Sequence, residues 1–76
     1  MDNESMVRYS FNLASRFERE GKLLAALGLW IVADKFSPTP FWVARVHARA
    51  IAETIGLADP FPEITEPRES PGEVRP

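Results

Sequence analysis

The sequence contains one unbroken apolar run, LLAALGLWIVA at residues 23–33. Its eleven residues are too few to span a bilayer, which takes a helix of about 20 residues. The run begins after more than twenty residues that already show helical periodicity, and no A-x-A-like cleavage site follows it, so it does not resemble a signal peptide. We therefore predict a cytoplasmic helix that is apolar on every side. It is either buried around its whole circumference or covered in part by another molecule.

Helical periodicity continues on both sides of this run. Over residues 3–20, apolar and small side chains recur at spacings of three and four, which predicts a first helix that ends at Gly21 in the left-handed conformation. The proline-containing break SPTP then ends the apolar helix, because proline lacks a backbone N–H. A third helix is predicted to follow, with Thr39 as its N-cap and Pro40 in its first position, and to end at Gly56. Its apolar stripe comprises Phe41, Ala44, Ala48, Ile51, Ala52 and Ile55.

The composition changes after residue 58. Residues 59–76 hold five of the seven prolines and five acidic side chains, and such a segment buries too little apolar surface to offset the entropy lost on folding. We predict an all-α fold: a small three-helix domain over residues 1–58, built from an αα-hairpin and a third helix, followed by an extended, Pro-rich acidic tail over residues 59–76. Phe61 is expected to pack against the helices, and no stable secondary structure is expected from about Thr65 onward.

No pattern typical of an enzyme or a cofactor-binding protein is recognisable. The chain has no cysteine and a single histidine, His47, so disulfides and thiolate metal sites are excluded and a zinc or haem site is not expected. There is no glycine-rich phosphate loop, no pair of carboxylates, and no nucleophile with an adjacent base. We predict a non-enzymatic protein with no catalytic, cofactor-binding or metal-binding residue, and we interpret His47 as an ordinary, partly exposed histidine.

The charge distribution disfavours binding to nucleic acid. Residues 1–58 carry seven basic and six acidic side chains, and the whole chain has a formal net charge of −2, whereas DNA-binding proteins present a basic surface. A small helix-turn-helix regulator stays open as an alternative, with Arg45, His47 and Arg49 of the third helix facing DNA. A single tetratricopeptide-like hairpin is a further alternative, although solenoids need about three repeats.

The apolar helix also predicts self-association. A chain this short has a small core, and two flanking helices leave a strip of the central helix uncovered. One line of its side chains can face the hairpin while another meets a second copy related by a two-fold axis. The two neighbouring lines are Leu23, Leu27, Trp30 and Ile31, and next to them Leu24 and Gly28. We predict a homodimer in which Gly28 permits close approach, with Trp30 and Trp42 either in the core or at the interface.

A family resemblance rests on the segment ASRFEREGKLLAALGLW, a polar break, and the segment FWVARVHARA. Together they carry an alanine, an E-x-x-G element, further alanines, a leucine-tryptophan pair, and then a tryptophan and an arginine on the next helix. These are Ala14, Glu18, Gly21, Ala25, Ala26, Leu29, Trp30, Trp42 and Arg45. The pattern covers about residues 12–50 and resembles the ANR family, the small negative regulators of AraC-type transcription activators in Gram-negative bacteria and their phages.

The resemblance implies a non-enzymatic protein that regulates transcription by binding a transcription factor, possible partners being AraC-type activators, without contacting DNA or a membrane. The alternatives are the helix-turn-helix DNA-binding regulator and a phage-type inhibitor that docks on a host protein. The candidate residues for the contact with a partner or a second copy are Leu23, Leu24, Leu27, Gly28, Trp30, Ile31, Trp42 and Arg45.

Overall fold

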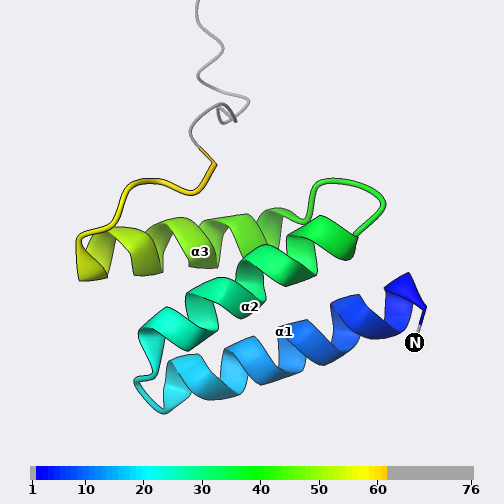
Figure 1. Cartoon of the computed structure of the whole chain (residues 1–76), viewed down its shortest axis with the longest axis horizontal. Helices are drawn as coiled ribbons and strands as arrows, with labels where there is room; N and C mark the ends of the chain where they lie inside the picture. Colours follow the sequence, from blue (N-terminus) through cyan, green and yellow to red (C-terminus); the bar gives the residue numbers. More distant parts are fainter. Residues whose placement is uncertain (1, 62–76) are drawn as a thin grey trace, which may run out of the picture.

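The computed structural model describes residues 2–61, which form three helices and, within that range, no strand (Figure 1). The helices are α1 (Asn3–Arg19), α2 (Leu23–Phe36) and α3 (Trp42–Ile55). The predicted all-α class is therefore confirmed. The predictions for the tail from residue 62 onward lie outside the described residues.

The two ends of α1 are both closed by local hydrogen bonds. The Asp2 side chain accepts a hydrogen bond from the Ser5 N–H at 2.8 Å and caps the N-terminus. At the other end, Gly21 has a φ of 80°, and the Lys22 N–H donates to the Phe17 carbonyl at 2.9 Å. This six-residue closure is a Schellman motif, and it needs a residue that adopts a positive φ without strain. The predicted end of the first helix is confirmed.

The predicted start of the third helix is wrong. Helix α3 begins at Trp42, with Phe41 in the N-cap position and no side-chain cap, so Thr39 and Pro40 lie in the loop before it. Phe41 has a φ of −100° and a ψ of 87°, outside the helical region, and its N–H donates to the Asp34 carboxylate of α2 at 2.9 Å, so a side chain from another helix supplies the cap in place of Thr39. The predicted end is confirmed, since Gly56 has a φ of 81° and the Leu57 N–H donates to the Ala52 carbonyl at 2.8 Å.

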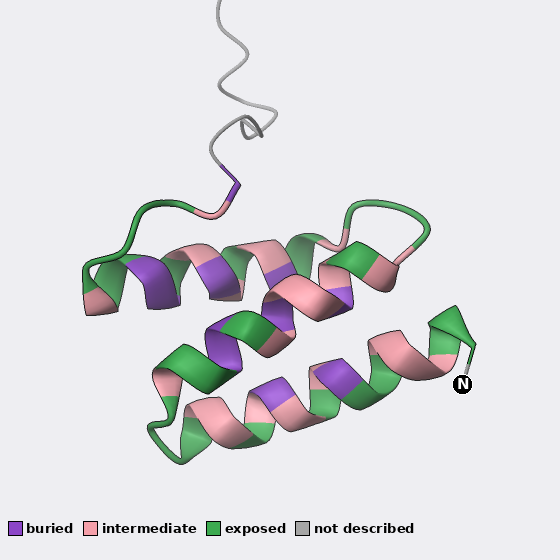
Figure 2. Cartoon of the chain, viewed as in Figure 1, coloured by how far each residue is buried: buried purple, intermediate pink, exposed green. Residues whose placement is uncertain are grey.

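Helix α2 lies between α1 and α3 in Figure 1 and packs against both. The backbone extends over 45 × 30 × 15 Å, which is a flattened arrangement. Alanines dominate the core and allow the helices to approach closely, and the buried residues lie mainly where the helices face one another (Figure 2). The core consists of Ala14, Ala26, Leu27, Trp30, Ala33, Ala44, Ala48, Ile51, Ala52 and Phe61. Phe61 therefore packs against the helices as predicted.

Trp30 is the large side chain of this core, with an exposed fraction of 1%. Its indole lies edge-on to Phe11 of α1, with ring centroids 5.2 Å apart, and is stacked on His47 of α3 at 4.4 Å. Its N–H donates to the Glu18 carboxylate at 3.0 Å, so the polar atom of this buried ring is satisfied. Of the two positions considered for Trp30, the core is the one it occupies.

Gly21 and Gly28 allow a matched pair of substitutions that tests the backbone conformation at each position. Gly21 has a positive φ, whereas Gly28 lies inside α2 without one, and an added Cβ at either would meet no atom within 4 Å. We expect Gly21→Ala to lower the free energy of unfolding by about 1 kcal/mol through backbone strain. We expect Gly28→Ala to raise the stability of the monomer by about 1 kcal/mol, because alanine is the better helix former. Urea unfolding followed by circular dichroism measures the free energy of unfolding of both variants. Equal changes of the same sign would contradict the backbone conformations assigned to Gly21 and Gly28.

Candidate protein-interaction surfaces

The predicted contact residues of α2 separate into inward and outward positions. Leu27 and Trp30 are buried in the core of the chain, with exposed fractions of 6% and 1%. Both therefore lie in the core and not on the surface; Trp30 is in contact with Phe11 of α1 and His47 of α3. Leu24 and Gly28 are exposed, and Leu23 and Ile31 are half-buried.

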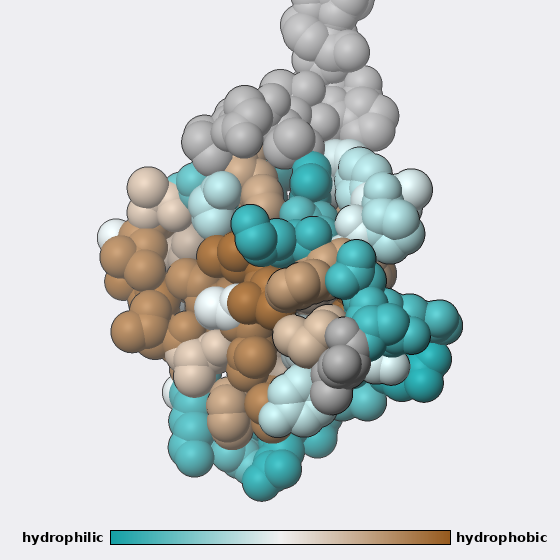
Figure 3. Space-filling model, turned by 45° about the vertical axis from the view of Figure 1, so that its right-hand side comes forward, coloured by the Kyte–Doolittle hydropathy of each residue, from teal (hydrophilic) through white to brown (hydrophobic). Residues whose placement is uncertain are grey.

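The outward side of α2 is apolar along most of its length. Leu24 is 68% exposed, Ala25 and Gly28 are also exposed, and the next turn continues with half-buried Ile31 and Val32. We refer to these five residues as the outer α2 stripe. Figure 3 shows a broad apolar area that extends from the left edge to the centre of one face of the molecule, with hydrophilic surface to its right and below it. Soluble monomers rarely leave a long apolar helix face open, so the outer α2 stripe is a candidate contact surface.

A second exposed apolar surface lies on α3, and of its residues only Trp42 was predicted from the sequence as a contact residue. Side chains on the side of α3 opposite to its core stripe are exposed, and Leu57 follows them just after the helix. The set comprises Trp42, Val43, Val46, Ala50 and Leu57, and we refer to it as the outer α3 stripe. The signal was present in the sequence, since valine or alanine recurs at spacings of three and four on both sides of this helix.

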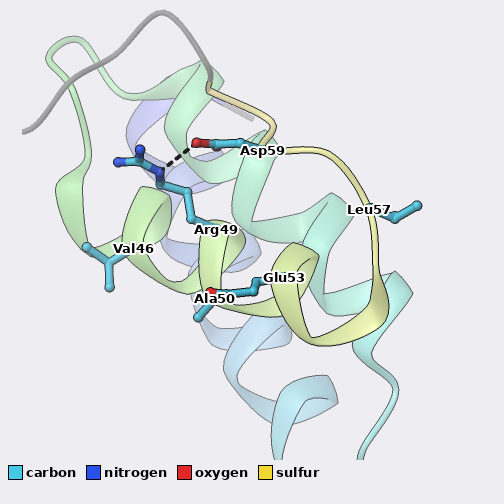
Figure 4. Close-up of a pocket in the computed structure, with 6 residues that line it drawn as sticks. All are labelled: Val46, Arg49, Ala50, Glu53, Leu57 and Asp59. Carbon is cyan, nitrogen blue, oxygen red and sulfur yellow. Dashed lines mark hydrogen bonds and ion pairs between the residues drawn. The ribbon is translucent and has the colours of Figure 1, made fainter.

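Val46 is the centre of the outer α3 stripe, with an exposed fraction of 59%. It borders two shallow hollows, and one of them is shown in Figure 4, where the Arg49 Nε donates to the Asp59 carboxylate at 3.0 Å. The charged pair forms the rim of the hollow around Val46 and Ala50. The residues that line the first hollow are Val46, Arg49, Ala50, Glu53, Leu57 and Asp59, and those of the second are Trp42, Val43, Val46 and His47.

Arg45, a predicted contact residue, is bound within the chain. Its guanidinium donates to both oxygens of Asp34, Nε to Oδ1 at 2.8 Å and Nη2 to Oδ2 at 3.1 Å. The guanidinium also lies over the rings of Phe61 at 4.9 Å and Trp42 at 5.6 Å. The exposed fractions of the two side chains are 13% for Arg45 and 10% for Asp34. Arg45 therefore joins α3 to α2 and positions Trp42, which is itself exposed.

The same pair changes the acidity of Asp34. Burial is the largest effect and alone would raise the pKa of this carboxyl. The hydrogen bonds from Arg45 and from the Phe41 N–H, together with the charge of Arg45, outweigh it and hold the pKa of Asp34 below its ordinary value of 3.8. The charged carboxylate is thus the form that fits the folded chain.

His47 lies at the boundary between α1 and α3. Its Nδ1 is 3.0 Å from the Glu18 Oε1 that also accepts the Trp30 N–H, and its ring is stacked on Trp30. The side chain is 41% exposed, which agrees with the predicted partly exposed histidine. Glu18 of α1 therefore binds one side chain from α2 and one from α3, and it helps to fix the three helices relative to one another.

Two further observations concern residues 2–61. Within this range, no group of three or more His, Asp or Glu side chains is placed to hold a metal ion. The helices of the same range are too short or too polar to reach across a bilayer. No family model, curated protein or solved structure matches this chain.

The Asp34–Arg45 pair predicts a specific loss of stability. We expect Asp34→Asn to lower the free energy of unfolding at pH 7 by about 3 kcal/mol, because the substitution leaves the buried guanidinium without its counter-charge. The pKa of Asp34 is lower in the folded than in the unfolded chain. Its contribution is therefore complete above the unfolded value and is lost as the pH falls through 3.8 and below.

Urea unfolding at pH 7 and at pH values below the ordinary Asp pKa measures both effects. In the wild type, part of the stability lost in acid comes from protonation of Asp34. The Asp34→Asn variant should not show this part of the loss. The more exposed pair Arg49–Asp59 supplies the control, since Asp59→Asn should cost less than about 1 kcal/mol. Equal losses in the two variants would contradict the assigned role of Asp34.

Proposed function

We propose that the chain is a non-enzymatic regulator of transcription that acts by binding another protein, and that the outer α3 stripe makes the contact. The observation that carries this proposal is the row of exposed apolar side chains on the outside of α3, with Val46 at its centre. A monomer gains nothing from exposing these side chains to water. A partner that covers them would gain the free energy of their burial.

The composition of the outer α3 stripe suits a protein partner. Trp42 supplies a large aromatic side chain of the type enriched among residues that dominate binding energy. The charged groups at the edge, Arg49, Glu53 and Asp59, surround the apolar centre as polar residues surround the centre of typical protein interfaces. An apolar helix face of this length fits a hydrophobic groove, where side chains spaced by three and four residues act as anchors.

The resemblance to the ANR family supports a transcription factor as the partner, with AraC-type activators as the first candidates. The Trp42 and Arg45 of that resemblance both lie at the N-terminal end of α3. There Arg45 is paired with Asp34 and supports the exposed Trp42 ring. In this proposal Arg45 orients the contact surface, and Trp42 touches the partner.

The helix-turn-helix alternative receives less support from the same helix. Arg45 is bound to Asp34, and Arg49 is bound to Asp59 at 3.0 Å, so both arginines expected to face DNA make ion pairs within the chain. The outer side of α3 presents apolar side chains in place of a basic surface. The phage-type inhibitor alternative uses the same apolar surface and differs only in the identity of the partner.

The proposal is tested by charging the centre of the outer α3 stripe. We expect Val46→Glu to weaken binding to the partner by about tenfold or more, because it places a carboxylate in the apolar centre of the contact. The fold should be unchanged, since Val46 is exposed. The matched control is Tyr9→Glu, which charges an exposed apolar position on α1 and should leave binding as it is.

The binding measurement titrates the fluorescently labelled chain with purified AraC-type activators from the genome that encodes it. A control titration uses duplex DNA at several salt concentrations. Partner binding that Val46→Glu weakens and Tyr9→Glu does not is the expected result. Tight DNA binding that falls steeply with salt would favour the helix-turn-helix alternative. If no activator binds, while chemical cross-linking through the outer α3 stripe captures a host enzyme, the phage-type inhibitor is favoured.

A further inference from the structure

We infer that the outer α2 stripe is the contact surface of a homodimer, in which the α2 helices of two copies cross in antiparallel orientation with Gly28 at the two-fold axis. This surface is distinct from the outer α3 stripe that is proposed to bind the regulatory partner. The two proposals can therefore fail or succeed separately.

Gly28 is the first observation that points to a second molecule. It is exposed and lies in the middle of a helix, where glycine is a poorer helix former than alanine. An added Cβ at this position would meet no atom within 4 Å, so no packing contact within the described chain requires a glycine there. A second helix that crosses at Gly28 would use the missing side chain, because the two backbones could then approach closely.

The residues around Gly28 fit such a crossing. In an antiparallel arrangement about Gly28, Leu24 of one copy lies opposite Val32 of the other, and Ala25 lies opposite Ile31. Each large side chain of the outer α2 stripe then has an apolar counterpart, and Gly28 lies nearest the axis. Leu24, which is 68% exposed in the single chain, would be the side chain that gains most from the contact.

Charge selects the antiparallel orientation. Lys35 is the exposed charged residue at the C-terminal end of the stripe, about 10 Å along the helix from Gly28. A parallel pair would bring the two Lys35 ammonium groups together, whereas an antiparallel pair separates them by about 20 Å, beyond the screening length of physiological salt.

The size of the stripe sets the strength of the dimer. A helix of this length offers a strip about 20 Å long and about 10 Å wide, so two copies together bury about 400 Å² of strip, well below the about 1,000 Å² of a stable, specific interface. The association is therefore weak and transient, and the dimer forms only at high protein concentration. Monomer and dimer exchange as the protein concentration changes.

Sedimentation equilibrium of the full chain, over a concentration range that reaches hundreds of micromolar, tests the association itself. We expect the average mass to rise from monomer to dimer. Leu24→Glu should shift the Kd upward by at least about tenfold, because it charges the apolar contact. Val46→Glu serves as the matched control and should leave the Kd unchanged. A monomer mass throughout the range would overturn the inference.

The geometry is tested by cross-linking, because the natural chain has no cysteine and each introduced one is alone. Under mild oxidation Gly28→Cys should form a disulfide-linked dimer, since the two-fold axis brings the two positions together. Leu24→Cys and Lys35→Cys should not, because an antiparallel crossing holds each of these pairs farther apart than the roughly 7 Å limit between Cα atoms. Val46→Cys controls for random collision.

Each remaining outcome contradicts the inference. Efficient cross-linking of Leu24→Cys and Lys35→Cys would show a parallel pair. Cross-linking of Val46→Cys without that of Gly28→Cys would show that the outer α3 stripe is the self-association surface. In that case the proposed partner contact of α3 would also need revision, whereas loss of the dimer alone would leave it intact.

Discussion

The buried indole of Trp30 joins the three helices. It extends from α2 into the space between α1 and α3, where it contacts Phe11 on one side and is stacked on His47 on the other. Its N–H and the His47 ring both bind the Glu18 carboxylate, so a single acceptor on α1 fixes a side chain from each of the other helices. Because α1 and α3 flank α2 and pack against it around this ring and the surrounding alanines, Leu24, Ala25 and Gly28 of α2 and the outer side of α3 stay exposed within residues 2–61.

Much of this fold follows from local signals in the sequence. The spacing of apolar residues and the two glycines with positive φ, Gly21 and Gly56, define where the helices lie and where α1 and α3 end. The start of α3 could not be predicted this way. It depends on Asp34, seven residues earlier in the chain, which binds the Phe41 N–H and also pairs with Arg45. Local cap preferences favoured Thr39, and a contact between elements overrode them.

The contact surfaces were predicted only in part, for a related reason. An unbroken apolar run has no polar side that marks solvent, so the sequence predicted that α2 leaves a strip uncovered but did not determine which one. Leu27 and Trp30 face the core, and Leu24 and Gly28 face outward. In α3 the core stripe of alanines and Ile51 was predicted, and the residues between its positions were not considered as a surface. Val43, Val46 and Ala50 are those residues, and together with the polar pairs that fix α3 they form the surface proposed to bind a regulatory partner.

The central claim is that two separate helix faces stay open in the monomer and are covered by different molecules. Methyl NMR with a soluble paramagnetic agent measures this directly, because the agent broadens the signals of methyl groups that it can reach. At low protein concentration, the Leu24 and Val46 methyls should broaden strongly while those of Leu27 and Ile51 stay sharp. As the concentration rises, the account predicts protection of Leu24 with no protection of Val46. Protection of Val46 together with Leu24, or of neither at any concentration, would contradict it.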